Sequence, residues 1–320
     1  MGGGRIALSH IPQIMAHPRC DLVAIVEPRF LSRFILRRVF NIPTFSDFSQ
    51  ILGLELDAVF ILTPPSAHAS IASNALDSGV AAFVEKPLTL RAEDSYRLSD
   101  LAKEARLPFT VGYVYRHHPL YIELKSRLAS NDLGALFEFK MHMLGNVAKS
   151  GQVNWRSKGA GAGCLYDYGC HALNLTDFLL GNLTAPSVRS FSSEVSISSL
   201  DSVEFSIHAE QYKSAEIVLR CDWARPEVRK ATLVVEAVFE GGTVKCDGQL
   251  IKIDLAVGQS EVVGLSRLNT SVDFYLRGEE FSRQLTDFVD QCCNGELDYT
   301  ILDSSVVTDQ LIENILGQCS

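Results

Sequence analysis

The sequence lacks several features that would assign a protein to a common class. No uninterrupted apolar stretch reaches the roughly 18 residues of a membrane-spanning helix, and no charged-then-apolar leader opens the chain. The eight cysteines form no C-x-x-C pair, and a chain of 320 residues needs no disulfide staples. The adjacent histidines His117 and His118 seldom reach one ion, and no third ligand is evident nearby. We therefore expect a soluble, cytoplasmic protein with reduced thiols, no metal and no membrane partner.

Basic clusters are also scarce. The formal charge is -9, and no dense Lys/Arg run supplies the basic face that binding to nucleic acid requires. The nearest candidate is "RFLSRFILRR", in which Arg29, Arg33, Arg37 and Arg38 fall mostly at helical spacing. This spacing predicts a solvated helix face, with contact to a cofactor 2'-phosphate as the alternative. Nucleic acid is not expected as a partner.

A glycine turn stands at the start of the chain. Its spacing, Gly2-x-Gly4-x-x-Ala7, is the G-x-G-x-x-A form of the dinucleotide fingerprint, in which small residues allow a tight turn close to a pyrophosphate. A helical pattern follows, and then an apolar run over 22–26 that ends in Glu27. An acidic residue at that distance commonly accepts from the cofactor ribose. The alternative for Glu27 is a solvated carboxylate at a strand end.

The first third of the sequence alternates strand and helix patterns. Apolar runs that predict strands lie at 56–65, 80–88 and 108–113, and helical patterns lie at 70–79 and 92–107. Such alternation is typical of a doubly wound parallel sheet. We expect an α/β Rossmann domain over residues 1–114.

The pattern changes after residue 115. Between 136 and 263 most segments predict antiparallel strands with glycine turns, interrupted by one helix over 165–180, and two helices follow Gly278. We expect an α+β domain over 115–320 with a large, mostly antiparallel open-faced sheet. Because one face of such a sheet must be covered, we also expect a homodimer or homotetramer through it.

Two polar groups stand out against these apolar patterns. Glu85 and Lys86, in "VEKPL", follow a predicted parallel strand, at the end where ligands bind in open α/β sheets. Asp167, His171 and Asn174 lie at i, i+4 and i+7 of an otherwise apolar helix and form one polar stripe. Buried polar groups need partners, which either a ligand cavity or a self-satisfied Asp–His pair supplies.

These motifs resemble those of the Gfo/Idh/MocA oxidoreductases, nearly end to end. The resemblance rests on the glycine turn, "TPPSAHAS" (63–70), "EKPL", "GYVYRHHP", "NWR" (154–156), "GAGAG" before "DYGCHALN", and "FYLRGEEFSRQLTDFV". It implies an NAD- or NADP-binding Rossmann domain and hydride transfer to or from a secondary alcohol or ketone of a sugar, sugar nucleotide or cyclitol.

The resemblance also implies site residues. The catalytic residues are Lys86, Asp167 and His171. The cofactor-binding residues are Gly2, Gly4, Arg5, Ile6, Glu27, Thr63, Pro65, His68, Glu85 and Lys86. The substrate-binding residues are Lys86, Arg116, Trp155, Arg156, Asp167, His171 and Asn174. His171 is the expected base because its ordinary pKa lies nearest neutrality. Asp167 then fixes the imidazole tautomer, and Lys86 donates to the substrate oxygen.

Several questions stay open on this evidence. Relatives place an apolar strand before the glycines, and none precedes Gly2, so we expect a start codon assigned too late or a shortened chain. Glu27 favours NAD because a carboxylate repels a 2'-phosphate, while Arg29 and Arg33 leave NADP possible. Alternatives to a dehydrogenase are a catalytically silent dinucleotide-binding sensor and an NAD-dependent glycosidase.

Overall fold

The computed structural model describes residues 1–130, 132–147, 161–194, 199–268, 271–272 and 278–319. Contacts within the chain define two compact units. The first comprises Met1–Val114 and Ser271–Val306, and the second comprises Tyr115–Thr270 and Val307–Ser320. The expected division after residue 114 did not include the return of residues 271–306 to the first unit.

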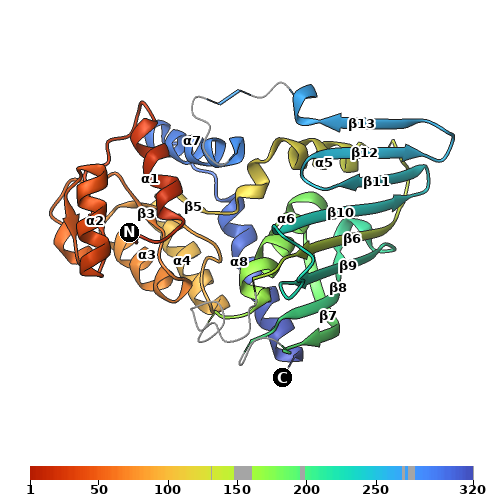
Figure 1. The fold of residues 1–320 in the computed structure, drawn as a ribbon, viewed down its shortest axis with the longest axis horizontal. Coiled ribbons are helices and arrows are strands. Elements are labelled where there is room, and N and C mark those ends of the chain that lie inside the picture. The colour runs from red at the N-terminus through yellow and green to blue at the C-terminus, as the bar shows by residue number, and fades with distance from the viewer. Residues whose placement is uncertain (131, 148–160, 195–198, 269–270, 273–277, 320) are drawn as a thin grey trace. The chain divides into compact units, whose positions relative to one another are not determined.

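The first unit contains the alternating elements that the sequence predicts (Figure 1). Its strands are short and parallel: β1 (Ile25–Val26), β2 (Thr44–Phe45), β3 (Ala58–Ile61), β4 (Ala81–Val84) and β5 (Phe109–Val111). Its helices are α1 (Ala7–Ala16), α2 (Phe30–Phe40), α3 (His68–Asp77), α4 (Ala92–Ala105) and α7 (Glu279–Asn294), together with the first residues of α8 (Thr300–Gln318). β4 is buried throughout, as expected of a strand covered on both faces.

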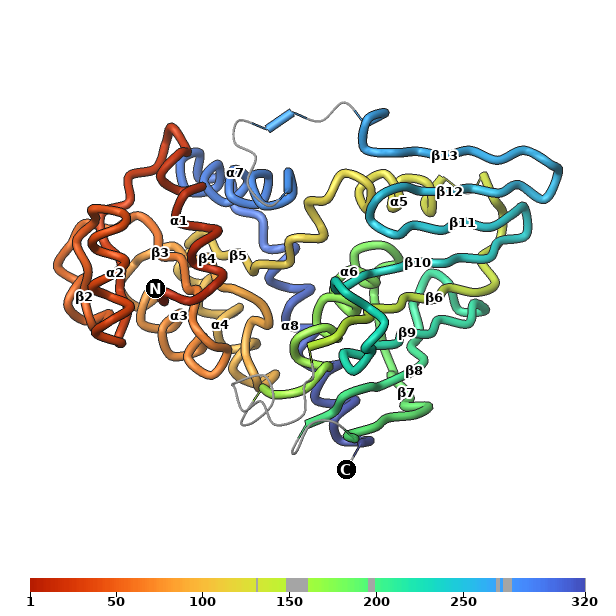
Figure 2. The backbone as a smooth tube through the Cα atoms, viewed as in Figure 1, coloured from red at the N-terminus to blue at the C-terminus, as the bar shows by residue number. Residues whose placement is uncertain are grey.

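The parallel sheet of the first unit is divided into two pieces, β1-β2 and β3-β4-β5, where one continuous sheet was expected. Met1 and Gly2 lie between the pieces. Gly2 N donates to Val26 O at 2.8 Å, Leu62 N donates to Met1 O at 2.8 Å, and the Met1 amino group donates to Phe60 O at 2.7 Å. Figure 2 shows the chain starting beside β3. Met1 and Gly2 thus bridge the two pieces of the sheet at one end only.

A cavity of about 650 Å³ lies beyond this bridge, within the first unit. Its walls include Leu22 and Ala24 before β1, Ala58 and Phe60 of β3, and Phe288 of α7. Among the described residues, no hydrogen bond joins β1 to β3 directly. The space therefore has the position of an additional parallel strand between these two edges.

The return of α7 to the first unit follows from its amphipathic pattern. Its inward face buries Leu285, Phe288 and Val289. The Phe288 ring packs edge-on against Phe60 at 5.4 Å and Phe83 at 5.8 Å between centroids. These aromatic contacts join the sheet core, which explains why a late segment completes the first unit.

The second unit is built on an eight-stranded sheet with the order β13-β12-β11-β10-β6-β9-β8-β7. All neighbouring strands are antiparallel except β6 and β9, so the expectation of a mostly antiparallel sheet is confirmed. The strands are β6 (Leu136–Leu144), β7 (Leu183–Ser192), β8 (Ser202–Ala209), β9 (Glu216–Asp222), β10 (Thr232–Phe239), β11 (Gly242–Cys246), β12 (Leu250–Leu255) and β13 (Ser260–Gly264).

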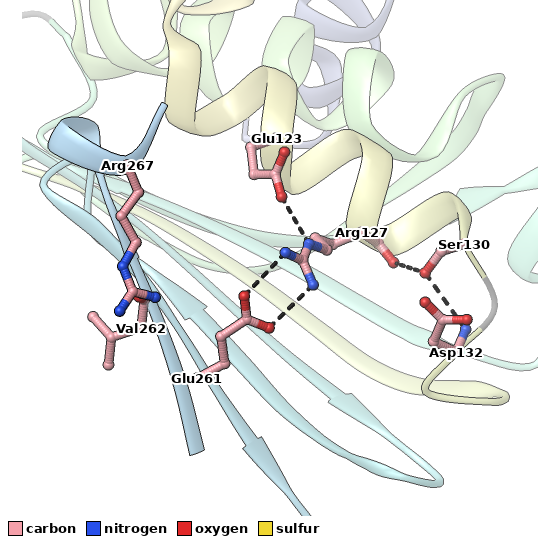
Figure 3. Close-up of polar contacts among 7 residues, drawn as sticks. All are labelled: Glu123, Arg127, Ser130, Asp132, Glu261, Val262 and Arg267. Atoms are coloured by element: carbon pink, nitrogen blue, oxygen red, sulfur yellow. Dashed lines mark hydrogen bonds and ion pairs between the residues drawn. The ribbon is translucent and has the colours of Figure 1, made fainter. Parts of the chain in front are cut away.

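The helices α5 (Pro119–Ala129) and α6 (Cys170–Leu180) pack against each other and against this sheet (Figure 1). Arg127 of α5 holds the edge strand β13. Its Nε donates to Glu123 Oε1 at 2.7 Å, and its two terminal nitrogens donate to the two oxygens of Glu261 at 3.1 Å each (Figure 3). The bidentate geometry fixes β13 against α5 more specifically than a single ion pair does.

Candidate functional site

The glycine turn is closed on one side and open on the other. Gly2 has φ +91°, and a Cβ there would lie 2.6 Å from Leu62 O. A Cβ on Gly3 would collide with Leu36 Cδ1 and lie 2.9 Å from Glu27 Oε2. A Cβ on Gly4, by contrast, would meet no atom within 4 Å. The turn therefore needs glycine for its own packing at two positions, and at Gly4 its backbone faces free space.

Unused hydrogen-bonding groups surround this open side. Among the described residues, the backbone N–H groups of Gly4, Arg5, Ile6 and Ala7 have no acceptor. The buried Thr63 Oγ1, which follows β3 next to the glycine turn, also has no hydrogen-bond partner in the described part of the chain. A helix N-terminus with free N–H groups is suited to a phosphate. These residues fit a dinucleotide, which would supply acceptors for the N–H groups and a partner for Thr63.

Glu27 lies at the end of β1 against the glycine turn, where the sequence predicts the ribose acceptor. Its Oε2 accepts from Gly3 N at 2.7 Å, and its Oε1 accepts from Arg29 N and Nε at 2.9 Å each. Burial raises the pKa of Glu27, but the hydrogen bonds from Arg29 and Gly3 outweigh it, so the pKa lies below its ordinary value. Glu27 is therefore an ionised carboxylate at neutral pH.

Glu85, which follows β4, contacts residues of α1 and of the segment just after β5 in the first unit. Its Oε1 accepts from His10 Nε2 of α1 at 3.0 Å, and its Oε2 accepts from Lys86 N at 3.2 Å. A Cβ on Gly112, just after β5, would lie 3.1 Å from the same carboxylate. Glu85 thus holds the start of the turn that carries Lys86, and Lys86 itself is half-buried.

His68, predicted to line the nicotinamide, is fully buried. Its Nδ1 lies 2.9 Å from Pro87 O, and its Nε2 lies 2.9 Å from Thr63 O. Two carbonyl acceptors favour the imidazolium, but burial has the larger effect and lowers the pKa of His68. The structure therefore gives His68 the role of joining the Thr63 segment to the Lys86–Pro87 turn. The buried Pro65 begins a 3-10 turn in the same segment.

Asp167 and His171 lie in the second unit, at the start of α6. The expected continuous helix over 165–180 is in fact a π-helical turn, Leu165–Gly169, followed by α6. A Cβ on Gly169 would lie 2.5 Å from Leu165 Cδ1, so glycine allows this turn to close. Such π turns frequently mark functional sites.

The side chains at this turn differ in exposure. Asp167 is 9% exposed, and His171 is partly exposed. The Tyr115 ring meets the His171 ring edge-on, with centroids 5.0 Å apart. This contact restricts the orientation of the imidazole, while its exposed part stays accessible to a reactant.

Asn174, the third member of the predicted stripe, is tied to Arg116 instead. Arg116 Nε donates to Asn174 Oδ1 at 2.6 Å, and Arg116 Nη2 donates to Asp177 Oδ2 at 3.1 Å. Asn174 Nδ2 donates in turn to Thr308 Oγ1 at 3.2 Å. Arg116 is only 7% exposed. The substrate roles of Arg116 and Asn174 stay predictions, and the observed contacts give both residues a part in fixing α6.

Two predicted substrate residues, Trp155 and Arg156, lie outside the described residues, which omit 148–160. In the described ranges, no cluster of three or more His, Cys, Asp or Glu side chains is arranged to hold a metal ion. Within those same ranges, no helix combines the length and the apolar character that crossing a bilayer demands.

The sequence analysis missed three residues that shape these groups. Gly3 lies between the fingerprint glycines and packs against Leu36. His10 is a polar residue on the buried face of α1, and Tyr115 follows the last strand of the first unit. A polar residue on an apolar helix face was the available signal for His10, whereas nothing in the spacing identifies Tyr115.

The structure so far describes a dinucleotide-binding Rossmann unit and a sheet unit that carries a polar, partly exposed Asp–His helix start. Comparison with protein-family models gives the same two parts. Residues 1–113 match the oxidoreductase family with an NAD-binding Rossmann fold, and residues 121–245 match the GFO/IDH/MocA C-terminal domain. The chain belongs to the GFO/IDH/MocA family of oxidoreductases.

Curated relatives include several named sugar and cyclitol enzymes. The scyllo-inositol 2-dehydrogenase (NAD(+)) of Bacillus subtilis is 28% identical over 184 residues, which is 57% of this chain and 53% of the relative. The dTDP-3,4-didehydro-2,6-dideoxy-alpha-D-glucose 3-reductase of Streptomyces violaceoruber is 32% identical over 128 residues, 40% of this chain and 37% of the relative. The matched regions thus span about half or less of the length of these relatives.

The fold is also that of solved structures. A levoglucosan dehydrogenase in complex with NADH and levoglucosan aligns with a TM-score of 0.87 at 19% identity, covering 99% of this chain and 95% of that chain. At this identity the likeness establishes the fold, and both units take part in it.

Proposed function

We propose that the protein is an NAD(P)-dependent dehydrogenase that acts on a CH–OH group of a sugar, sugar nucleotide or cyclitol. The observation that carries the proposal is the open glycine turn, where free N–H groups, the unpartnered Thr63 hydroxyl and the ionised Glu27 lie in one unit. The names of the curated relatives support the substrate class. NAD is the preferred cofactor because the Glu27 carboxylate repels a 2'-phosphate.

In the proposed reaction, the nicotinamide accepts or delivers the hydride when the cofactor is bound. The residues of the chain bind, orient and move the proton. Oxidation of a carbinol releases the hydroxyl proton, so a base must reach that oxygen. We assign this role to His171, whose ring is oriented by Tyr115. To Asp167, which lies four residues earlier in the chain, we assign the role of fixing the tautomer of this imidazole. Lys86 donates a hydrogen bond to the same oxygen and stabilises its developing negative charge.

A pair of substitutions tests these roles. His171→Asn and Lys86→Met should each lower kcat by roughly 10²–10⁴, the usual contribution of a positioned acid or base. The Kd for the dinucleotide should change by no more than a few fold. Gln291→Asn on α7 is a matched control that should change neither quantity. Wild-type turnover in both variants, measured on an identified substrate, would overturn the assignment.

The alternatives differ in what they require of the same residues. A silent sensor binds the dinucleotide and gains nothing from a lysine and an Asp–His pair, and an NAD-dependent glycosidase releases a sugar without net reduction of the cofactor. Screening free cyclitols, sugars and nucleotide sugars for cofactor reduction, together with a glycoside for product release, separates the three. Net cofactor reduction supports the dehydrogenase alone.

We also propose a homodimer or homotetramer formed through the open face of the eight-stranded sheet, in the cytoplasm. This face carries half-exposed ion pairs, among them Lys140–Glu138 and Lys245–Glu236, each with N···O 2.6 Å. Free thiols, four of them buried, fit a reducing compartment. Sedimentation velocity tests the assembly, which should weaken in Lys140→Glu if this face is the interface and stay unchanged if it is not.

A further inference from the structure

The helix α2 exposes an apolar surface that the proposed reaction does not use. Five of its eleven residues are large hydrophobic side chains with more than half of their surface exposed. We call these five residues the α2 face: Phe30 (69%), Leu31 (73%), Phe34 (57%), Ile35 (58%) and Val39 (65%). Isolated exposed apolar residues are normal, but five on one helix mark an interaction surface.

The orientation of α2 is fixed from its other side. Leu36 is buried in the core cluster of the first unit, and Phe40 packs against that cluster. At about 100° of rotation per residue, the α2 face covers roughly half of the helix circumference, opposite Leu36. Figure 1 shows α2 on the outer side of the first unit. Turning these side chains inward would expose Leu36, so the apolar face is a property of the folded unit.

The charge around this face is of one sign. Residues 28–46 contain four arginines and no acidic residue, in a chain whose formal charge is -9. Arg29 pairs with Glu27 at 2.9 Å, and Arg33 donates to the backbone oxygens of Glu27 and Pro28. Arg37 and Arg38 are exposed, and in the described part of the chain their guanidinium groups have no acceptor. A cationic, apolar helix therefore stands out on an acidic protein.

We propose that the α2 face docks on a membrane surface that contains anionic lipids, with α2 lying in the plane of the interface. Apolar side chains on one side of a helix enter the boundary between headgroups and acyl chains, while neighbouring arginines meet the lipid phosphates. Arg38 projects within the apolar arc, and its long aliphatic stem allows the guanidinium to reach the headgroups. This proposal is the opposite of the expectation from the sequence that the protein has no membrane partner, and the experiment below decides between the two.

A lipid surface fits better than a second copy of the chain. In a symmetric contact each copy would present the same face, bringing up to eight arginines together with no carboxylate from residues 28–46 to neutralise them. A fluid lipid interface also requires no matching shape from the helix. The acidic remainder of the chain is repelled by anionic lipid, which favours the orientation with α2 toward the membrane.

The dimensions of α2 make this binding peripheral and reversible. A helix of 11 residues is about 16 Å long, roughly half of the hydrocarbon thickness that a spanning helix crosses. Each arginine near an anionic surface strengthens binding on the order of fivefold, an effect that salt weakens. We therefore expect binding that is measurable at low salt and lost at high salt.

Co-sedimentation of the full chain with vesicles tests the proposal. The vesicles contain phosphatidylcholine alone or mixed with phosphatidylserine. The protein should bind the mixed vesicles at least roughly tenfold more tightly than the neutral ones. The double variant Leu31→Ser/Phe34→Ser should lose roughly tenfold or more of this affinity, and Arg37→Gln/Arg38→Gln should lose the preference for phosphatidylserine. Val257→Ser removes a still more exposed apolar side chain (90%) from the other unit and should change nothing.

A second measurement separates loss of docking from loss of folding. Phe34→Trp should show blue-shifted emission with mixed vesicles and quenching by brominated acyl chains, because the side chain enters the boundary region. Equal sedimentation of wild type with both kinds of vesicle, or unchanged binding in the Leu31/Phe34 variant, overturns the proposal. So does self-association that is abolished by Leu31→Ser/Phe34→Ser in the absence of lipid, since the face would then bind a second copy.

Discussion

The buried amino group of Met1 makes the stability of a chain beginning at this residue depend on pH. The amino group donates to Phe60 O at 2.7 Å between the two pieces of the parallel sheet. Burial lowers its pKa from the ordinary value of 8.0 to about 5, although the Glu27 carboxylate acts in the opposite direction. A folded chain that begins at Met1 therefore holds this group uncharged at neutral pH.

The difference in the pKa of the amino group between the folded and the unfolded chain sets the sign and the size of this pH dependence. Between about pH 5 and pH 8 the unfolded chain binds a proton at this group and the folded chain does not. The free energy of unfolding should consequently fall as the pH is lowered from 8 toward 5. A difference of about three pKa units corresponds to about 4 kcal/mol, an upper bound for an amine that can shift toward water.

Acetylation of the amino terminus isolates this contribution. The acetylated chain cannot be protonated there, and the adjacent cavity of about 650 Å³ has room for the acetyl group. The buried His68, whose pKa is also lowered, destabilises both proteins equally at low pH. Urea unfolding at several pH values should give a steeper loss of stability for the free amine than for the acetylated chain. Equal slopes from pH 8 to pH 5 would refute the burial of this amine.

Three further predictions concern the turn and the edge strand. Gly3→Ala should lower the free energy of unfolding by about 1–3 kcal/mol because the new Cβ collides with a core side chain. Gly4→Ala, whose Cβ meets no atom within 4 Å, should leave thermal unfolding unchanged. It should weaken dinucleotide binding, measured by titration calorimetry. Glu27→Gln should reduce the preference for NAD over NADP in paired fluorescence titrations, and an unchanged ratio would contradict its role. Arg127→Met should cost about 1 kcal/mol in chemical unfolding because it removes a half-exposed bidentate pair, compared with a smaller loss for Arg189→Met, whose ion pair is single.

Local patterns predicted the elements of the first unit well, because alternating apolar runs and glycine turns are local signals. The helix over 279–294 was predicted, but its return to the first unit was not, since the aromatic packing of Phe288 on Phe60 joins residues more than 200 positions apart. The division of the sheet into two pieces depends on hydrogen bonds from Met1 and Gly2, which no spacing reveals.

The site was predictable in part for similar reasons. The fingerprint predicted that Glu27 lies beside the glycine turn because the spacing is fixed by the turn itself, and Glu27 accepts from Gly3 N there. The cofactor roles of Gly2, Gly4 and Glu27 stay predictions. The polar stripe was extended to Asn174 on the assumption of a regular helix, but a π turn opens it and Asn174 bonds to Arg116. Helical periodicity also predicted a solvated arginine face on α2, and it did not anticipate how much apolar surface the same helix exposes.

Cofactor reduction tests the central claim most directly. Purified protein is mixed with NAD and one compound at a time from a panel of cyclitols, sugars and nucleotide sugars. The absorbance of the reduced nicotinamide is followed in each mixture, and the Kd for NAD is measured in parallel. We predict turnover of at least one CH–OH compound by the wild type, and a rate lower by roughly 10²–10⁴ in His171→Asn with nearly unchanged Kd. Tight NAD binding with no reduction by any compound of these classes would contradict the account and leave a dinucleotide-binding protein without dehydrogenase activity.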